Sequence, residues 1–194
     1  PDPNVRYVAR SAAGVVPQAY VSGSVAEGAC KLAGKRLCQP VEWRMACGGK
    51  QGTTYPYGPS QKPGVCHDTG KAPMLVYHAD SLKRGWGLAE MNDPRLDQLE
   101  GTLLPTGSHE GCANEYGVHD MVGSLHEWTA DPNGTFQGGY WLDTHEHGDG
   151  CAYRTIAHPF SYHDYSIGFR CCSDGDPLAR DRSESAERGD AGSK

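Results

Sequence analysis

The eight cysteines constrain the fold of this chain more than any other feature of its sequence. They are Cys30, Cys38, Cys47, Cys66, Cys112, Cys151, Cys171 and Cys172. The number is even and the CxxC pairs that typically hold zinc are absent, so we predict disulfides rather than metal–thiolate clusters. Because disulfides form and persist in oxidising compartments, the pattern also predicts an exported protein, secreted or periplasmic.

The length of the chain, 194 residues, suits one domain with a real core. With 26 glycines, 13 prolines and only 37% hydrophobic residues, much of the backbone is expected in turns, which favours a loop-rich α+β fold. We expect an extended lead-in over residues 1–23 and the domain over residues 24–172. Residues 173–194 are charged and poor in large apolar side chains, so we predict a flexible tail.

The charge pattern argues against two classes of partner. The net charge is −6, and residues of both signs are scattered along the chain, so no cationic stripe is predicted for nucleic acid or for anionic lipid. No apolar run reaches the length needed for membrane insertion. The first residues do not form a signal peptide, and we expect any export signal to have been removed.

Two short helices are predicted from local signals. Ser24 and Glu27 form a capping box that predicts a helix over residues 25–33. Pro40 suits a first helical position and predicts a helix over residues 40–47, and a glycine follows each segment.

The rest of the chain is predicted to be loops and short strands. Residues 1–21 carry alternating apolar positions that favour a strand or two, and strands are also predicted over residues 136–141 and 167–171. Residues 52–104 are rich in turn signals and show little periodicity, which predicts a long irregular stretch.

Four separated phrases occur in an order typical of one known family. They are AGKRLCQPVEW at 33–43, YPYG at 55–58, YGVHDMVGSLHEWT at 116–129 and IGFRCC at 167–172. Together they resemble the formylglycine-generating enzyme, or sulfatase-modifying-factor, family. The resemblance implies a C-type-lectin-like fold with few long elements, which agrees with the composition.

The resemblance implies two of the disulfides and a calcium site. The implied pairs are Cys30 with Cys171 and Cys47 with Cys151. Among the other four cysteines we expect Cys38 with Cys172 and Cys66 with Cys112, although other pairings of these four stay open. The implied calcium ligands are side-chain oxygens of Asp120 and Glu127 and backbone carbonyls of Gly123 and Leu125, a hard oxygen set that suits calcium.

The family's catalytic cysteine pair is missing. In the copper-dependent members two thiolates follow the Gly-Gly pair, but here Gly138-Gly139 is followed by YWLDTHEHGDG without a cysteine until Cys151. Because copper(I) favours sulfur ligands, formylglycine formation by the two-thiolate route is not expected. The catalytic residues are therefore unknown from the sequence.

Histidines and carboxylates stand in that region instead. The candidate ligands for a transition metal are His126, Asp143, His145, His147, His158 and His163. Such a set suits iron, copper(II) or zinc, whereas solvent-facing histidines on a loop are the simpler interpretation. The triplet Asn133-Gly134-Thr135 also matches a glycosylation acceptor, a pattern that is common by chance in turns.

Two functional hypotheses follow from these residues. The first is a non-haem, metal-dependent oxidase or oxygenase that acts on a peptide or small molecule through a His/carboxylate site. The second is a non-catalytic, calcium-stabilised, lectin-like module that binds a peptide or glycan. A redox-active metal in the site would separate the two.

Overall fold

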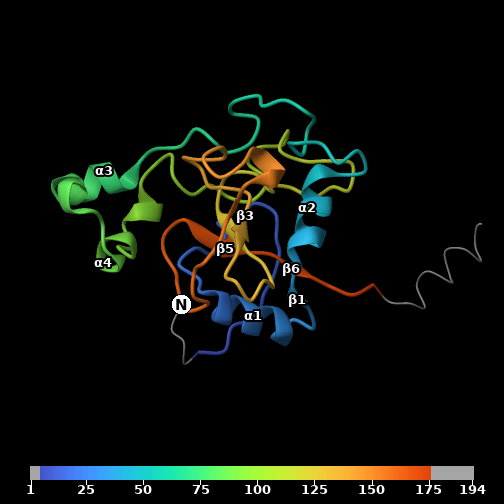
Figure 1. Ribbon diagram of the computed structural model, residues 1–194, viewed down its shortest axis with the longest axis horizontal. Helices are drawn as coiled ribbons and strands as arrows, with labels where there is room; N and C mark the ends of the chain where they lie inside the picture. The colour runs from blue at the N-terminus through green and yellow to red at the C-terminus, as the bar shows by residue number, and fades with distance from the viewer. Residues whose placement is uncertain (1–4, 176–194) are drawn as a thin grey trace, which may run out of the picture.

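Two small sheets form the centre of the molecule in the computed structural model, which describes residues 5–175 (Figure 1). The larger sheet has the order β4-β3-β2-β5, and the smaller pairs β1 with β6. β5 runs parallel to β2, and the other pairs are antiparallel. The strands are β1 (Arg36–Leu37), β2 (His126–Trp128), β3 (Phe136–Gln137), β4 (Arg154–Thr155), β5 (Ile167–Phe169) and β6 (Cys171–Cys172).

The first predicted helix is present as α1 (Gly23–Leu32). Its cap differs from the prediction: the Ser22 hydroxyl accepts the N–H of Val25, whereas the Ser24 hydroxyl donates to the Phe160 carbonyl. The helix therefore begins two residues earlier than the Ser24 capping box indicated. Its buried face includes Ala26 and Cys30, four residues apart, and packs beside β1 and β5.

The second helix, α2 (Pro40–Gly48), begins at the predicted proline. Glu42 accepts the backbone N–H of Gln39 and so satisfies one of the free donors of the first turn. Trp43 and Cys47 lie four residues apart and are both fully buried, so this helix contributes one narrow apolar stripe to the core.

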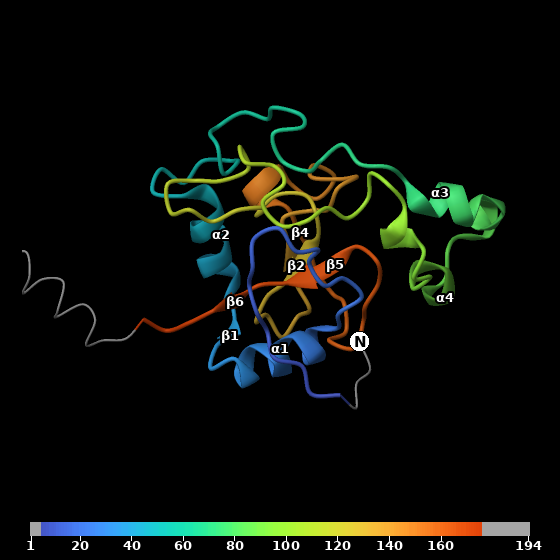
Figure 2. The same cartoon turned by 180° about the vertical axis from the view of Figure 1, so that it is seen from behind.

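The stretch over residues 52–104 is less irregular than its sequence suggested. It contains α3 (Pro73–Tyr77), η1 (Ala79–Arg84), α4 (Leu88–Met91) and η2 (Leu96–Gln98). We call residues 73–98 the side lobe, because they protrude from one side of the molecule in both views (Figures 1 and 2). Each element has at most six residues, too few to give the periodicity from which a helix is predicted.

Two predictions about strands are wrong: one described segment holds no strand, and the other strand is shorter than expected. Residues 5–21 contain no helix or strand within the described part of the chain, although Ala19 and Val21 are buried in the core. The strand expected over residues 136–141 ends at Gln137 because Gly138 and Gly139 both have positive φ. A Cβ at Gly138 would lie 2.6 Å from the Met121 carbonyl oxygen, so glycine is required at this close approach.

Four disulfides fasten the loops to the sheets and helices. The pairs are Cys30–Cys171, Cys38–Cys172, Cys47–Cys151 and Cys66–Cys112. These are the four pairs expected above. The adjacent cysteines of β6 thus hold α1 and the end of β1, while Cys47–Cys151 joins α2 to η3 (Gly150–Ala152). This framework fits a protein that folds in an oxidising compartment.

Within residues 5–175 no helix is long and apolar enough to cross a membrane. Three buried clusters make up the core, and each contains one fully buried tryptophan: Trp43, Trp128 or Trp141. Most of the predicted tail, residues 176–194, lies outside the described residues.

Candidate functional site

His126 occupies the centre of the region where the sequence predicted a site. It lies on β2 and is buried among the rings of Phe136, Tyr140 and Tyr153, with centroids 5.4, 5.0 and 5.4 Å away. Burial lowers the pKa of His126 to about 3, so the imidazole is neutral at physiological pH. Its Nδ1 atom is buried without a hydrogen-bond partner among the described residues.

Aromatic rings connect three imidazoles of this region. The ring of Tyr153 contacts both His126 and His147, with centroid distances of 5.4 and 5.7 Å. Phe136 similarly contacts both His126 and His158, with centroid distances of 5.4 and 4.5 Å. The three imidazoles therefore belong to one cluster of packed rings.

Asp143 is committed to hydrogen bonds within its own loop. One carboxylate oxygen accepts the N–H groups of His145 and Glu146, at 2.8 and 2.9 Å, and the other accepts the Tyr153 hydroxyl at 2.7 Å. Burial alone would raise the pKa of this carboxyl, but the hydrogen bonds outweigh it and hold the pKa below the ordinary value. Asp143 thus orders the loop and orients Tyr153.

The remaining two candidate ligands lie apart from the cluster. His145 pairs through Nδ1 with Asp149 at 2.9 Å, and both side chains are largely exposed. The Nδ1 atom of His163 lies 2.6 Å from the Asn92 side-chain oxygen, at the junction with the side lobe. Among the described residues, no group of three His, Cys, Asp or Glu side chains is arranged to hold a metal ion. No three of the six candidate ligands form such a group.

The cysteines leave no thiolate for a copper site of the family type. All eight are in disulfides, and Cys151, the first cysteine after Gly138-Gly139, pairs with Cys47. A disulfide sulfur carries no ionisable proton and does not provide the thiolate ligand that copper(I) favours.

The predicted calcium loop fits calcium only in part. Asp120 and Gly123 have positive φ, so the backbone turns sharply where carbonyl ligands are expected. However, the Glu127 carboxylate accepts two hydrogen bonds from Arg170, both at 2.8 Å, and one from Trp43 Nε1 at 2.6 Å. Asp120 accepts the N–H of Gly107 at 2.7 Å. A cation at this loop would compete with the Arg170 guanidinium for Glu127.

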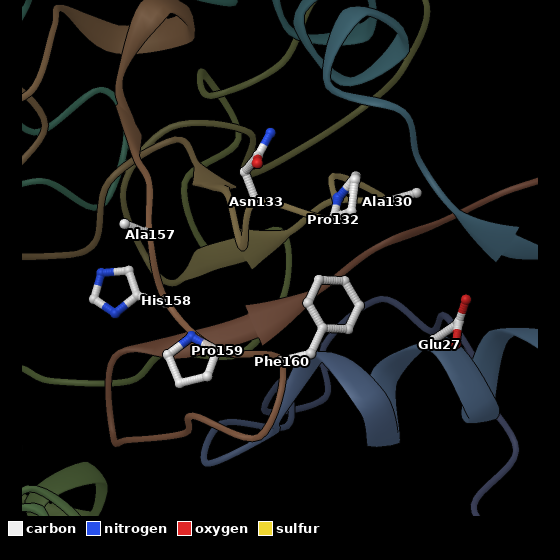
Figure 3. A pocket seen from close by; sticks show the side chains of 8 residues that line it. All are labelled: Glu27, Ala130, Pro132, Asn133, Ala157, His158, Pro159 and Phe160. Atoms are coloured by element: carbon white, nitrogen blue, oxygen red, sulfur yellow. The ribbon is translucent and has the colours of Figure 1, made fainter.

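An open groove of about 700 Å³ lies between the β2–β3 turn and the segment after β4 (Figure 3). We call it the Phe160 groove. Its lining residues are Glu27, Ala130, Pro132, Asn133, Ala157, His158, Pro159 and Phe160. The wall segment is fixed by the Ala157 N–H, which donates to the Asn133 carbonyl at 3.0 Å, and Ala157 is held at a φ of 70°.

The groove combines apolar walls with polar groups. Phe160 and two prolines form the apolar part, while Glu27, Asn133 and His158 offer hydrogen-bonding groups. Burial lowers the pKa of His158, so its neutral ring offers one donor and one acceptor. The sequence did not predict that these residues form one site, because no spacing pattern joins α1 to the other two segments.

The fold and the site together define a loop-rich α+β domain that is held by four disulfides and retains no free thiol. The chain belongs to the family of the sulfatase-modifying factor enzyme 1-like domain, whose model matches residues 6–175. This confirms the resemblance stated above and the fold class that it implied.

Curated relatives include the inactive Cα-formylglycine-generating enzyme 2 of Bos taurus, 30% identical over 81% of this chain and 50% of that protein. The formylglycine-generating enzyme of Mus musculus is 30% identical over 59% of this chain and 27% of that protein. The chain thus spans about half the length of the Bos taurus relative and 27% of the length of the Mus musculus relative. The solved structure of PvdO from Pseudomonas aeruginosa matches with a TM-score of 0.50 and 18% identity, covering 80% of this chain and 61% of that one. This last likeness concerns the fold alone.

Proposed function

We propose that this chain is an exported, non-catalytic binding module that holds a peptide or glycan in the Phe160 groove. The observation that carries the proposal is the complete use of the eight cysteines in disulfides. A family domain without a thiolate pair keeps its disulfide-stapled scaffold but loses the copper ligands on which the two-thiolate oxidation depends.

The names of two relatives support the same proposal. The proteins of Bos taurus and Mus musculus that cover 81% of this chain are both called inactive. That description is theirs, and it comes to this chain as support for a non-catalytic role.

The metal-dependent oxidase hypothesis has less support. A mononuclear site needs three or more protein donors that converge on one ion. Among the described residues no three such donors are arranged in this way. In the cluster around His126, the imidazoles pack against the rings of Tyr153 and Phe136, and Asp143 is satisfied by its own loop. Binding of iron, copper or zinc there would require these packed rings to rearrange.

The Phe160 groove has the features of a ligand site. Its volume of about 700 Å³ lies within the range of small-ligand pockets, about 300–1,000 Å³. An aromatic ring packs well against the apolar face of a sugar or a side chain. The planar polar groups of Glu27, Asn133 and His158 could then fix the ligand's hydroxyl or amide groups by hydrogen bonds.

We also propose that calcium binds the loop over residues 120–127 and stabilises the module. Its expected ligands remain Asp120, Gly123, Leu125 and Glu127. Calcium accepts irregular oxygen geometry, and the positive φ values of Asp120, Gly123 and Ser124 make a tightly turned loop that could direct carbonyl oxygens to one point.

A binding screen with groove variants tests the proposed function. The full chain would be presented to glycan and peptide arrays beside a Glu27→Gln/Asn133→Ala double variant, with Glu110→Gln as a control at an exposed position outside the groove. We expect a ligand that the control binds like the unmodified chain and the double variant binds at least about tenfold more weakly, because the carboxylate of Glu27 and the side-chain amide of Asn133 are both lost.

Metal analysis of protein purified without chelator separates the two hypotheses. The binding-module proposal predicts no stoichiometric iron, copper or zinc by mass spectrometry. One such ion per chain that disappears on changing His126 and His147 to Ala would favour the oxidase and overturn the proposal.

A further inference from the structure

Asp97 is a buried carboxyl group without a partner. It lies on η2 in the side lobe, directly after Leu96, which is fully buried. Both carboxyl oxygens of Asp97 are inaccessible to solvent and have no hydrogen-bond partner among the described residues. Buried polar groups in folded proteins are nearly always paired, so this group requires a physical reason.

The groups that face Asp97 make ionisation costly. Besides burial, the nearby Asp164, from the segment before β5, raises the pKa of Asp97 by charge repulsion. The charge of Asp97 in turn adds to the effect of burial in raising the pKa of the phenols of Tyr20 and Tyr165. Burial, and secondarily the charge of Asp164, raise the pKa of Asp97 to about 8. Arg95 and His78, two basic residues of the same lobe, are paired with Asp93. No cation among the described residues is recorded as a partner that would offset a charge on Asp97.

Asp97 also lies at the junction between the side lobe and the body of the molecule. Tyr20 spans that junction: its N–H donates to the Asp164 carbonyl at 3.1 Å and its hydroxyl donates to the Asp93 carbonyl at 2.8 Å. The N–H of Tyr165 donates to the Met91 carbonyl of the lobe at 3.1 Å. Leu96 packs in the same buried cluster as Tyr165 and as Trp141 of the body.

Asp164 itself is fully satisfied. One of its carboxylate oxygens accepts the N–H and hydroxyl of Ser166, and the other accepts the hydroxyl of Tyr162. Asp97, by contrast, accepts no hydrogen bond among the described residues, so of the two carboxyl groups it is the one that lacks any partner for a negative charge.

We propose that Asp97 is a proton-controlled latch that keeps the side lobe docked on the body while its carboxyl group is neutral. Loss of the proton to solvent base breaks only the carboxyl O–H bond and leaves a carboxylate beside Asp164 in an apolar junction. The lobe then opens so that water solvates this charge. Protonation reverses the opening.

Linkage fixes how the opening must depend on pH. In the open state Asp97 is solvated and has an ordinary pKa of about 4, whereas in the closed state its pKa is about 8. Between these values the open state binds fewer protons than the closed state. The opening equilibrium constant therefore rises about tenfold for each pH unit in that interval.

Hydrogen exchange of the full chain measures this directly. The reporters are the lobe amides of Met91 and Leu96, which donate to Gly87 and Asp93. The Thr129 amide, which donates to Thr135 within the body, is the internal reference. After correction for intrinsic exchange, we expect protection of the lobe amides to fall about 100-fold from pH 5 to pH 7, with little change at the reference.

Variants distinguish the latch from other titrations. Asp97→Asn keeps the shape and removes the charge, so lobe protection should vary less than about threefold over the same interval. Asp80→Asn, at an exposed position of the lobe, should behave like the unmodified chain. Asp164→Asn removes the neighbouring charge and should move the high-pH end of the dependence to lower pH.

Two results would overturn the latch. One is lobe protection that does not depend on pH in the unmodified chain. The other is an Asp97→Asn variant that keeps the same slope, since another group would then control the lobe. Neither result bears on ligand binding by the Phe160 groove, which is measured separately.

Discussion

The guanidinium of Arg170 binds the buried carboxylate of Glu127 through two parallel hydrogen bonds, both 2.8 Å long. Glu127 lies on β2, and Arg170 lies between β5 and β6, so the pair joins the two sheets. Trp43 Nε1 adds a third hydrogen bond, at 2.6 Å, and ties α2 to the same carboxylate. The loop expected to bind calcium is thus also a structural junction.

Loss of Arg170 should therefore be strongly destabilising. We expect Arg170→Ala to lower the free energy of unfolding by about 3 kcal/mol, because Glu127 is left buried without its cationic partner. Urea unfolding would measure this. The matched control is Arg36→Ala, whose partner Glu42 is 37% exposed and would be solvated, at a cost of about 1 kcal/mol or less. Equal losses in the two variants would show that burial of Glu127 is not decisive.

His126 should make the free energy of unfolding depend on pH in the acid range. Its pKa is lowered from 6.5 to about 3 in the folded chain, so below about pH 6.5 the unfolded chain binds a proton that the folded chain does not. This contribution is present above pH 6.5 and is lost as pH falls toward 3. His126→Phe should weaken the dependence and leave stability at pH 7 nearly unchanged, because an unpaired polar atom is removed. Chemical denaturation at several pH values tests this, and an unaltered acid dependence in the variant would contradict it.

Calcium should stabilise the chain if the loop over residues 120–127 binds it. We expect the melting temperature of chelator-treated protein to rise when calcium is added, since an ion that binds only the folded state contributes about 2.7 kcal/mol at 100 times its Kd. Asp120→Asn should reduce the shift, and magnesium should give a smaller one because it demands a regular octahedron. An unchanged melting temperature would mean that Arg170 retains Glu127 and that the loop binds no calcium.

The Cys66–Cys112 disulfide should contribute strongly to stability, because it closes a long loop. The cysteines are 46 residues apart, and the chain-entropy model assigns such a closure about 4 kcal/mol. A Cys66→Ala/Cys112→Ala double variant tests this in calorimetry. A loss below about 1 kcal/mol would indicate that the reduced loop is already ordered by its other contacts.

Much of the fold could be predicted from the sequence, because its signals are local or covalent. Pro40 marks the start of α2, and apolar side chains four residues apart in α1 and α2 mark their buried faces. The family resemblance implied the pairs Cys30–Cys171 and Cys47–Cys151. The other two pairs were a choice among pairings that the sequence left open. The side lobe could not be found in this way, because its helical segments are too short to show a period and are held by contacts with Trp141 and Tyr165, distant in sequence.

The candidate site was harder to predict for a different reason. His145 and His147 are two residues apart, a spacing that places side chains on the same side of an extended segment, but spacing does not reveal which rings and carboxylates each imidazole contacts. In the structure Tyr153 contacts both His126 and His147, whereas His145 turns to Asp149. Asp97 likewise gave no signal in the sequence, because only the packing of the lobe against the body makes it a buried and unpaired acid.

This family member has no free thiol for copper-dependent oxidation, and thiol labelling of the unfolded chain measures this. The protein would be unfolded in denaturant without reductant and treated with an alkylating reagent. The mass of the intact chain would then be measured by mass spectrometry. We expect no added label on any of the eight cysteines, and peptide mapping should return the pairs 30–171, 38–172, 47–151 and 66–112. Two labelled cysteines in each chain would contradict the account and reopen the thiolate chemistry of the family.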